Sequence, residues 1–154
     1  MYAADFDYVK ASSIEEAISL KGSSDDSNFL AGGHSLIPAM KLRLSTPQKL
    51  IDISGLDELK NISENGNYIS IGALCTHKQC AESDIIQSIC PALSDAASVI
   101  GDPHVRNKGT IGGALAHSDP QADYPGVVLA LNASFTLKGT SGERTIDAVD
   151  YFTG

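Results

Sequence analysis

Two short glycine-containing strings carry the residue types that bind an anion. The first, Ala31-Gly32-Gly33-His34-Ser35, follows a predicted strand and precedes a helical segment. Adjacent glycines let the backbone approach a ligand closely, and consecutive N–H groups beside a helix N-terminus form a cradle for phosphate. The string lacks the Gly-Lys-Ser/Thr ending of a Walker loop and the third glycine of the dinucleotide fingerprint. Taken alone, a Gly-Gly pair after a strand is more often only a turn.

The second string, Thr110-Ile111-Gly112-Gly113, repeats this chemistry with a hydroxyl and two further glycines. Asp119 and Asp123 follow it. A carboxylate would repel a phosphate, but it accepts hydrogen bonds from the hydroxyls of a sugar or a ribityl chain. Asp119 precedes a proline and is also typical of a turn or a helix cap. The preceding Arg106 and Lys108 could contact phosphate, or face solvent or a partner.

The histidines and cysteines offer weaker alternatives. His104, His117 and Asp119 could in principle form a two-histidine, one-carboxylate metal site, but their spacing matches no helical metal motif. We therefore predict no metal on this chain and assign no catalytic acid or base. The three cysteines form neither a disulfide framework nor a Cys-x-x-Cys pair, and they indicate reduced thiols in the cytoplasm.

The overall composition is that of an acidic globular protein. The 154 residues carry a formal net charge of −8 and a pI of about 4.7, and lysine and arginine form no cluster in the sequence. We therefore predict no nucleic-acid binding, because it depends on clustered cations. No apolar run is long enough to span a bilayer, and residues 1–5 do not resemble a signal peptide.

The elements that must position the first string form a strand–helix–strand–loop–helix–strand order up to about residue 55. Strands are expected near residues 6–9, 28–31 and 50–53. A helix should begin after a capping box formed by Ser13 and Glu16, and a second should cover residues 36–44. This order favours a small, largely parallel sheet.

The elements around the second string are more mixed. Residues 59–64 and 68–72 flank an Asn-Gly turn and predict a hairpin. A capping box at residues 76–79 and the apolar spacing after residue 91 predict two helices. Residues 104–126 are rich in glycine and proline and are expected to be mostly loop. Residues 127–131 suit a helix or a strand, and a second hairpin should join residues 133–138 to 143–146.

Three longer strings resemble a known family: AGGHSLIPAMKLR at residues 31–43, IGALCTH at residues 71–77 and VRNKGTIGGALAHSDPQADYP at residues 105–125. The sequence resembles the FAD-binding medium subunit of molybdenum hydroxylases, the family of carbon monoxide dehydrogenase, aldehyde oxidoreductase and xanthine dehydrogenase. The resemblance implies an α+β, two-lobed FAD-binding domain of the vanillyl-alcohol-oxidase and cresol-methylhydroxylase type. A small parallel βαβ lobe would occupy residues 1–55 and a larger antiparallel lobe residues 56–154. That second lobe would be incomplete at its C-terminus, and the C-terminal domain of the family would be absent.

The same resemblance implies a set of FAD contacts. The pyrophosphate would lie against both glycine strings, the adenine would border residues 100–101, and a carboxylate would bind the ribityl chain. The implied residues are Ala31, Gly32, Gly33, His34, Ser35, Leu36, Ile100, Gly101, Thr110, Ile111, Gly112, Gly113, Ala114 and Asp123.

By the same resemblance, the chain would be the flavoprotein component of an oxidoreductase. Electrons would come from a molybdenum-cofactor large subunit through the [2Fe–2S] clusters of a small subunit to FAD, and then to an external acceptor. A separate chain could carry the missing C-terminal part. Two alternatives stay open: a non-catalytic assembly module that needs a second chain to hold FAD, and another flavoenzyme of this fold. The Asp-Pro-x-x-Asp string at residues 119–123 argues against an enolpyruvyl-sugar reductase.

Overall fold

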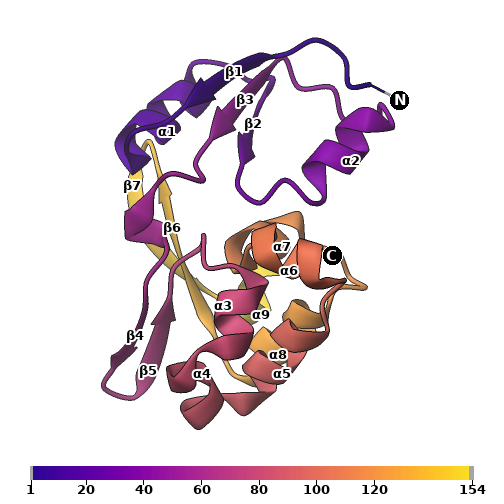
Figure 1. Ribbon diagram of the computed structural model, residues 1–154. Coiled ribbons are helices and arrows are strands. Elements are labelled where there is room, and N and C mark those ends of the chain that lie inside the picture. The colour runs from indigo at the N-terminus through magenta and orange to yellow at the C-terminus, as the bar shows by residue number, and fades with distance from the viewer. Residues whose placement is uncertain (1, 153–154) are drawn as a thin grey trace.

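A three-stranded parallel sheet forms the upper lobe of the structure, a computed structural model that describes residues 2–152 (Figure 1). Strands β1 (Asp7–Lys10), β2 (Ser27–Leu30) and β3 (Lys49–Asp52) lie in the order β1-β3-β2. The parallel register places Val9 and Phe29 on either side of Ile51. The small parallel sheet expected from the sequence is therefore confirmed.

Two helices accompany this sheet. Helix α1 (Ile14–Gly22) packs on it through Ala17, which is buried in a cluster with Ala11 and Ile51. The expected capping box is half right: the Ser13 hydroxyl accepts from the Glu16 N–H, but the Glu16 carboxylate accepts from the N–H of Ser12 at 2.7 Å. Helix α2 (Leu36–Lys41) ends three residues before the predicted end at residue 44.

An antiparallel hairpin follows the sheet. After a 3-10 turn, η1 (Asp57–Leu59), strands β4 (Ile62–Asn65) and β5 (Tyr68–Ile71) pair with Asn65 opposite Tyr68. Gly66 in the connecting turn has a φ of 62°. This is the left-handed conformation that an Asn-Gly turn favours, so the predicted hairpin is confirmed.

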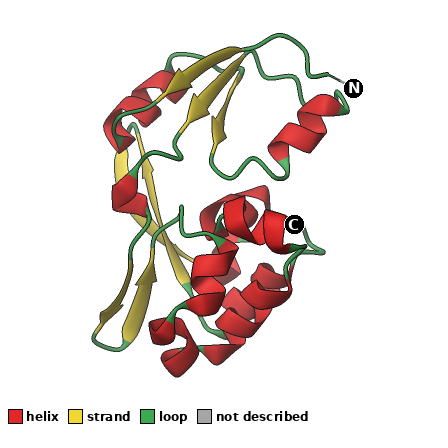
Figure 2. Cartoon of the chain, viewed as in Figure 1, coloured by secondary structure: helices red, strands yellow, loops and turns green. Residues whose placement is uncertain are grey.

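Helices make up most of the lower lobe (Figure 2). Its core buries side chains from six helices, with Cys80, Ile86 and Ala97 fully enclosed. The helices are α3 (His77–Glu82), α4 (Asp84–Ile89), α5 (Pro91–Val99), α6 (Pro103–Lys108), α7 (Ile111–His117), α8 (Asp123–Ala130) and α9 (Ala148–Tyr151). None of the helices within residues 2–152 has the length and apolar character needed to cross a membrane.

The prediction that residues 104–126 are mostly loop was wrong, because side-chain caps outweigh the glycines and prolines. The Asp102 carboxylate accepts from the Val105 N–H at 2.9 Å, with Pro103 in the first turn of α6. The Thr110 hydroxyl accepts from the Gly113 N–H at 3.1 Å and begins α7. Proline in a first turn and threonine at an N-cap both favour helix initiation.

A second hairpin connects the two lobes. Strands β6 (Ser134–Gly139) and β7 (Gly142–Asp147) pair along their whole length and reach up to α1 (Figure 1). There the Lys138 ammonium lies 2.5 Å from the Glu15 carboxylate. The two hairpins form separate two-stranded sheets. The core of the lower lobe is therefore built mainly by helices and not by one antiparallel sheet.

Candidate functional site

A cleft of about 1000 Å³ opens between the two lobes. The upper side is formed by the carboxyl ends of β2 and β3 and by α2, and the lower side by α3, α6 and the segments beside them. Ligands of open parallel sheets bind at this edge of the strands. The lining residues are Leu30, Ala31, Gly32, Gly33, His34, Ile37, Pro38, Lys41, Asp52, Ser54, Lys60, Leu74, Thr76, Lys78, Gln79, Val105, Asn107, Lys108 and Thr110.

The first glycine string lines this cleft with unused donors. Gly33 has a φ of 74°, which turns the chain from β2 into α2. Within residues 2–152, the backbone N–H groups of Gly32, Gly33, His34 and Ser35 donate to no protein acceptor. His34 is oriented locally, with Nδ1 lying 3.1 Å from the Gly32 carbonyl. Successive N–H groups around a left-handed residue have the arrangement that anion nests use.

The second glycine string is organised differently. The N–H groups of Ile111 and Gly112 donate to the carbonyls of Cys75 and Ala73, each at 2.9 Å. The N–H groups of Gly113 and Ala114 donate to the Thr110 hydroxyl and carbonyl. These four N–H groups therefore donate to acceptors inside the lower lobe. Thr110 is the member of the string that lines the cleft.

Close backbone packing holds each glycine string in place, because Gly32 and Gly112 carry no side chain. A Cβ on Gly32 would lie 2.2 Å from the Lys108 carbonyl oxygen and 2.8 Å from the Gly109 Cα. The first string of the upper lobe therefore rests directly on the backbone that precedes the second. Gly112 is packed in the same way, since a Cβ there would lie 2.6 Å from the Ala73 oxygen.

Four lysines that the sequence analysis did not bring together face this cleft: Lys41, Lys60, Lys78 and Lys108. They come from four separate segments, so the sequence alone does not show that they lie together. They create a cationic cleft in a chain whose net charge is −8. A partial signal existed, because Lys41 and Lys108 lie within the longer strings at residues 31–43 and 105–125 that carry the family resemblance. Such a cleft favours an anionic ligand.

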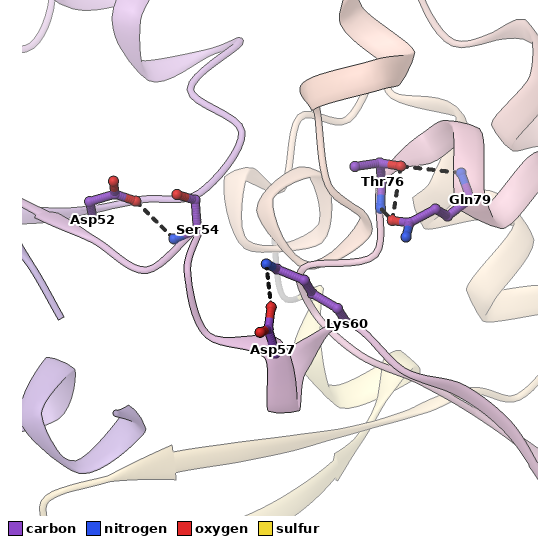
Figure 3. Close-up of polar contacts among 6 residues, drawn as sticks. All are labelled: Asp52, Ser54, Asp57, Lys60, Thr76 and Gln79. Carbon is purple, nitrogen blue, oxygen red and sulfur yellow. Dashed lines mark hydrogen bonds and ion pairs between the residues drawn. The ribbon is translucent and has the colours of Figure 1, made fainter. Parts of the chain in front are cut away.

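Polar side chains line the same opening in Figure 3. Asp52 is buried at the end of β3 and accepts hydrogen bonds from the Tyr8 hydroxyl and, at 2.8 Å, from the Ser54 N–H. Burial opposes its ionisation, but these hydrogen bonds outweigh burial and lower the pKa of Asp52. Lys60 pairs with Asp57 at 2.7 Å. The cleft therefore contains a fixed carboxylate among its cations.

Thr76 and Gln79 form the opposite side of this close-up (Figure 3). The Gln79 N–H donates to the Thr76 hydroxyl at 3.2 Å, and the Gln79 amide oxygen accepts from the Thr76 N–H at 2.8 Å. This reciprocal pair is the capping box predicted from the sequence, and it begins α3 at the rim of the cleft.

Behind the cleft lies a buried polar pair. His77 is 4% exposed and Tyr124 is 1% exposed, and His77 Nδ1 lies 3.1 Å from the Tyr124 hydroxyl. Burial, with a smaller contribution from the charge of His34, lowers the pKa of His77 to about 4. Burial also raises the pKa of Tyr124, and it raises the pKa of the neighbouring Cys80 thiol to about 12. All three groups are therefore uncharged at neutral pH.

The remaining predicted site residues do not line the cleft. Ser35 and Leu36 begin α2, residues 111–114 form the first turn of α7, and Asp123 begins α8. Ile100 and Gly101 connect α5 to α6, where the Arg106 guanidinium donates to their carbonyls at 3.0 and 3.3 Å. In the described part of the chain, no three histidine, cysteine or acidic side chains are grouped as metal ligands.

Comparison with known proteins shows the family to which the chain belongs. Residues 4–154 match the family described as the FAD binding domain in molybdopterin dehydrogenase. The glyceraldehyde dehydrogenase medium chain of Sulfolobus acidocaldarius is 44% identical over 154 residues, which cover 100% of this chain and 55% of that protein. The carbon monoxide dehydrogenase medium chain of Hydrogenophaga pseudoflava is 45% identical over 150 residues, 97% of this chain and 52% of that protein.

Solved structures show the same fold. Carbon monoxide dehydrogenase from H. pseudoflava superposes with a TM-score of 0.98 at 44% identity, covering 100% of this chain and 54% of that one. Quinoline 2-oxidoreductase from Pseudomonas putida 86 gives 0.97 at 32% identity, again covering 100% and 54%. The α+β fold expected from the sequence is confirmed, and the chain spans about half the length of the relatives it matches. The protein belongs to the family of FAD-binding domains of molybdopterin dehydrogenases.

Proposed function

We propose that this chain holds the pyrophosphate of FAD in the cleft between its lobes. The observation that carries the proposal is the row of four N–H groups at Gly32, Gly33, His34 and Ser35, which have no acceptor among residues 2–152 and line or border a lysine-rich cleft. Backbone donors and nearby cations together bind a diphosphate without a Walker loop.

Each side of the cleft would have a distinct task. Thr110, at the N-cap of α7, would contact the ligand from the lower lobe. Lys41 and Lys108 would neutralise phosphate charge from opposite lobes. Ile37 and Leu74 would exclude water between the charged groups. The ionised Asp52 would accept hydrogen bonds from ligand hydroxyls or amides and would repel a misplaced phosphate.

The remaining predicted contacts belong to this proposal as well. Ser35 and Leu36 would complete the upper cradle, and residues 111–114 would support Thr110 from behind. Asp123 would serve the ribityl chain, and Ile100 and Gly101 would border the adenine, although these three residues lie outside the cleft lining. We also propose the division into lobes at residues 55 and 56, which places the last parallel strand in one lobe and the first hairpin in the other.

We infer that the larger protein is an oxidoreductase of the molybdenum hydroxylase type. When bound, FAD would supply the redox chemistry, taking electrons from the [2Fe–2S] clusters of a small subunit and giving them to an external acceptor. A molybdenum-cofactor large subunit would oxidise the substrate. The naming of similar proteins as medium chains of carbon monoxide and glyceraldehyde dehydrogenase supports this assignment. A cytoplasmic location is part of the proposal and agrees with the three free cysteines.

Reconstitution tests the proposal directly. The purified chain is incubated with FAD, separated by gel filtration and measured for flavin absorbance, alone and together with the C-terminal half of a related medium chain. We expect flavin to co-elute with the protein. Retention only with the added half would favour an assembly module that needs a second chain, since this chain spans about half of its relatives. Absence of flavin in both cases would contradict FAD binding.

A further inference from the structure

His77 lies at the bottom of a column of contacts that ends at the first glycine string. The backbone of Gly109 is so close to the imidazole ring that a Cβ there would lie 2.6 Å from His77 Nε2 and 2.8 Å from Cδ2. On its other side, Gly109 supports Gly32, whose own Cβ would lie 2.8 Å from the Gly109 Cα. Gly109 is therefore enclosed between the His77 ring and the first glycine string.

The ring at the base of this column is fixed from several directions. The backbone N–H of His77 donates to the Gly109 carbonyl at 3.0 Å, and Nδ1 lies 3.1 Å from the Tyr124 hydroxyl. The rings of His77 and Tyr124 lie 5.4 Å apart. The capping box of Thr76 and Gln79 holds the start of α3, which carries His77. Tyr124 in turn follows Asp123 in the first turn of α8.

A displacement of the His77 ring would shift the backbone packed above it. Because neither Gly32 nor Gly109 has a side chain, the contacts run from ring to backbone and from backbone to backbone, with no flexible group between them. Close-packed interiors transmit such shifts instead of absorbing them. Removing the ring would leave a void beneath Gly109, into which the 108–109 backbone could move away from Gly32.

We propose that His77 is a positioning residue for FAD binding. The hydrogen bond to Tyr124 holds the imidazole, and the imidazole fixes the position of the 108–109 backbone. That position determines the spacing between the first glycine string and the Thr110 side of the cleft. This inference rests on the proposed function, because it assigns His77 a role in the same cofactor site. His77 does not line the cleft and is not a catalytic residue.

Three substitutions separate the parts of this role. His77→Ala removes both ring and hydrogen bond, His77→Phe keeps a ring beneath Gly109 but loses the hydrogen bond, and Tyr124→Phe removes the hydroxyl alone. FAD affinity is measured by titration of flavin fluorescence, and melting temperature is measured without FAD. We expect His77→Ala to weaken affinity by at least ~10-fold, with His77→Phe and Tyr124→Phe between it and the unmodified chain.

Ile86→Ala is the matched control for ordinary destabilisation. Ile86 is fully buried in α4 and forms no part of the column, so its truncation should lower the melting temperature while affinity is retained. Rescue by the ring-retaining phenylalanine and retained affinity in Ile86→Ala support a positioning role. Unchanged affinity in His77→Ala, or an equal loss in Ile86→Ala at similar stability, would overturn it.

A second measurement runs without FAD. The amide of residue 77 donates to the Gly109 carbonyl, and the amide of Gly109 donates to the Val105 carbonyl at 2.7 Å. Hydrogen exchange at both amides should accelerate in His77→Ala and remain slow in Ile86→Ala. If the unmodified chain binds no FAD either alone or with the C-terminal half of a related medium chain, the proposed function fails, and exchange still decides the positioning role. Unchanged exchange in His77→Ala would then overturn it.

Discussion

Gly32 and Gly109 pack backbone against backbone across the two lobes, so closely that a single methyl group at Gly32 would overlap the Gly109 Cα and the Lys108 oxygen. Two glycine strings that are far apart in the sequence thus form one surface. The contact also explains why Gly32 is a glycine independently of phosphate: the close approach of the lobes leaves no room for a Cβ.

Gly32→Ala tests this contact. The added Cβ would have to displace backbone atoms, so we expect a loss of about 1–3 kcal/mol in the free energy of unfolding, together with weaker FAD binding. Gly126→Ala is the control, because a Cβ there would meet nothing within 4 Å inside α8. Helix propensity predicts a gain of about 0.5–1 kcal/mol for that change. Equal stability of the two variants in urea unfolding would contradict the packing.

Gly33→Asp tests the anion nest. The substitution places a negative charge and a side chain where the pyrophosphate would lie, and we expect FAD retention to be lost. Gly66→Asp is matched to it, since Gly66 also has a positive φ but lies in the remote β4–β5 turn with open space around it. Gel filtration with flavin absorbance compares the two. Normal retention in Gly33→Asp would remove Gly33 from the site.

The cleft lysines should contribute through charge. Lys41→Gln and Lys108→Gln are each expected to weaken FAD binding by about 3- to 10-fold at low ionic strength. The difference in affinity between each variant and the unmodified chain should shrink in about 0.5 M salt, because salt at this concentration screens exposed charges. Lys49→Gln, at the opposite end of β3, should leave affinity unchanged. Equal effects at Lys41 and Lys49 in flavin titrations would assign the cations no local role.

The buried imidazole predicts a pH dependence of stability. The pKa of His77 is lowered from 6.5 to about 4, so between these values the unfolded chain takes up a proton that the folded chain does not. The contribution of His77 to the free energy of unfolding is therefore fully present above pH 6.5. It decreases as the pH falls from 6.5 to about 4 and changes no further below that pH. The shift corresponds to about 3 kcal/mol over the whole window.

Urea unfolding at pH 7.5 and pH 5 measures this dependence. His77→Phe lacks the titrating group, so the loss of stability between the two pH values should be smaller in the variant than in the unmodified chain. Carboxylates with a lowered pKa, such as Asp52, act mainly below this window. The same pH dependence in both proteins would show that His77 is not the responsible group.

Thiol reactivity should follow burial. Cys75 and Cys80 are fully enclosed and burial raises the pKa of both thiols, that of Cys80 to about 12, whereas Cys90 is half-buried. Because the thiolate is the reactive form, an aromatic disulfide reagent should modify Cys90 first in the native protein. Cys90→Ala should abolish the fast phase. A fast phase that persists in this variant would contradict the enclosed position of the other two thiols.

Local sequence determined most of the individual elements. The threonine hydroxyl and glutamine at residues 76–79, the Asn-Gly turn before Tyr68, and the apolar pattern of Leu50 and Ile51 each act over a few residues, and each predicted its element correctly. The same local logic failed at residues 104–126, where Asp102 and Thr110 cap helices that the glycines and prolines had argued against.

The assembly of the site was decided by tertiary structure. The sequence contained both glycine strings and supported binding of an anion. It could not show that the Ile111 and Gly112 N–H groups donate to Cys75 and Ala73, while the N–H groups of residues 32–35 find no acceptor within residues 2–152. Nor could it show that four dispersed lysines converge on one cleft or that His77 supports Gly109. Capping and turn formation depend on neighbours in the chain, whereas these relationships depend on how segments far apart in the sequence pack together.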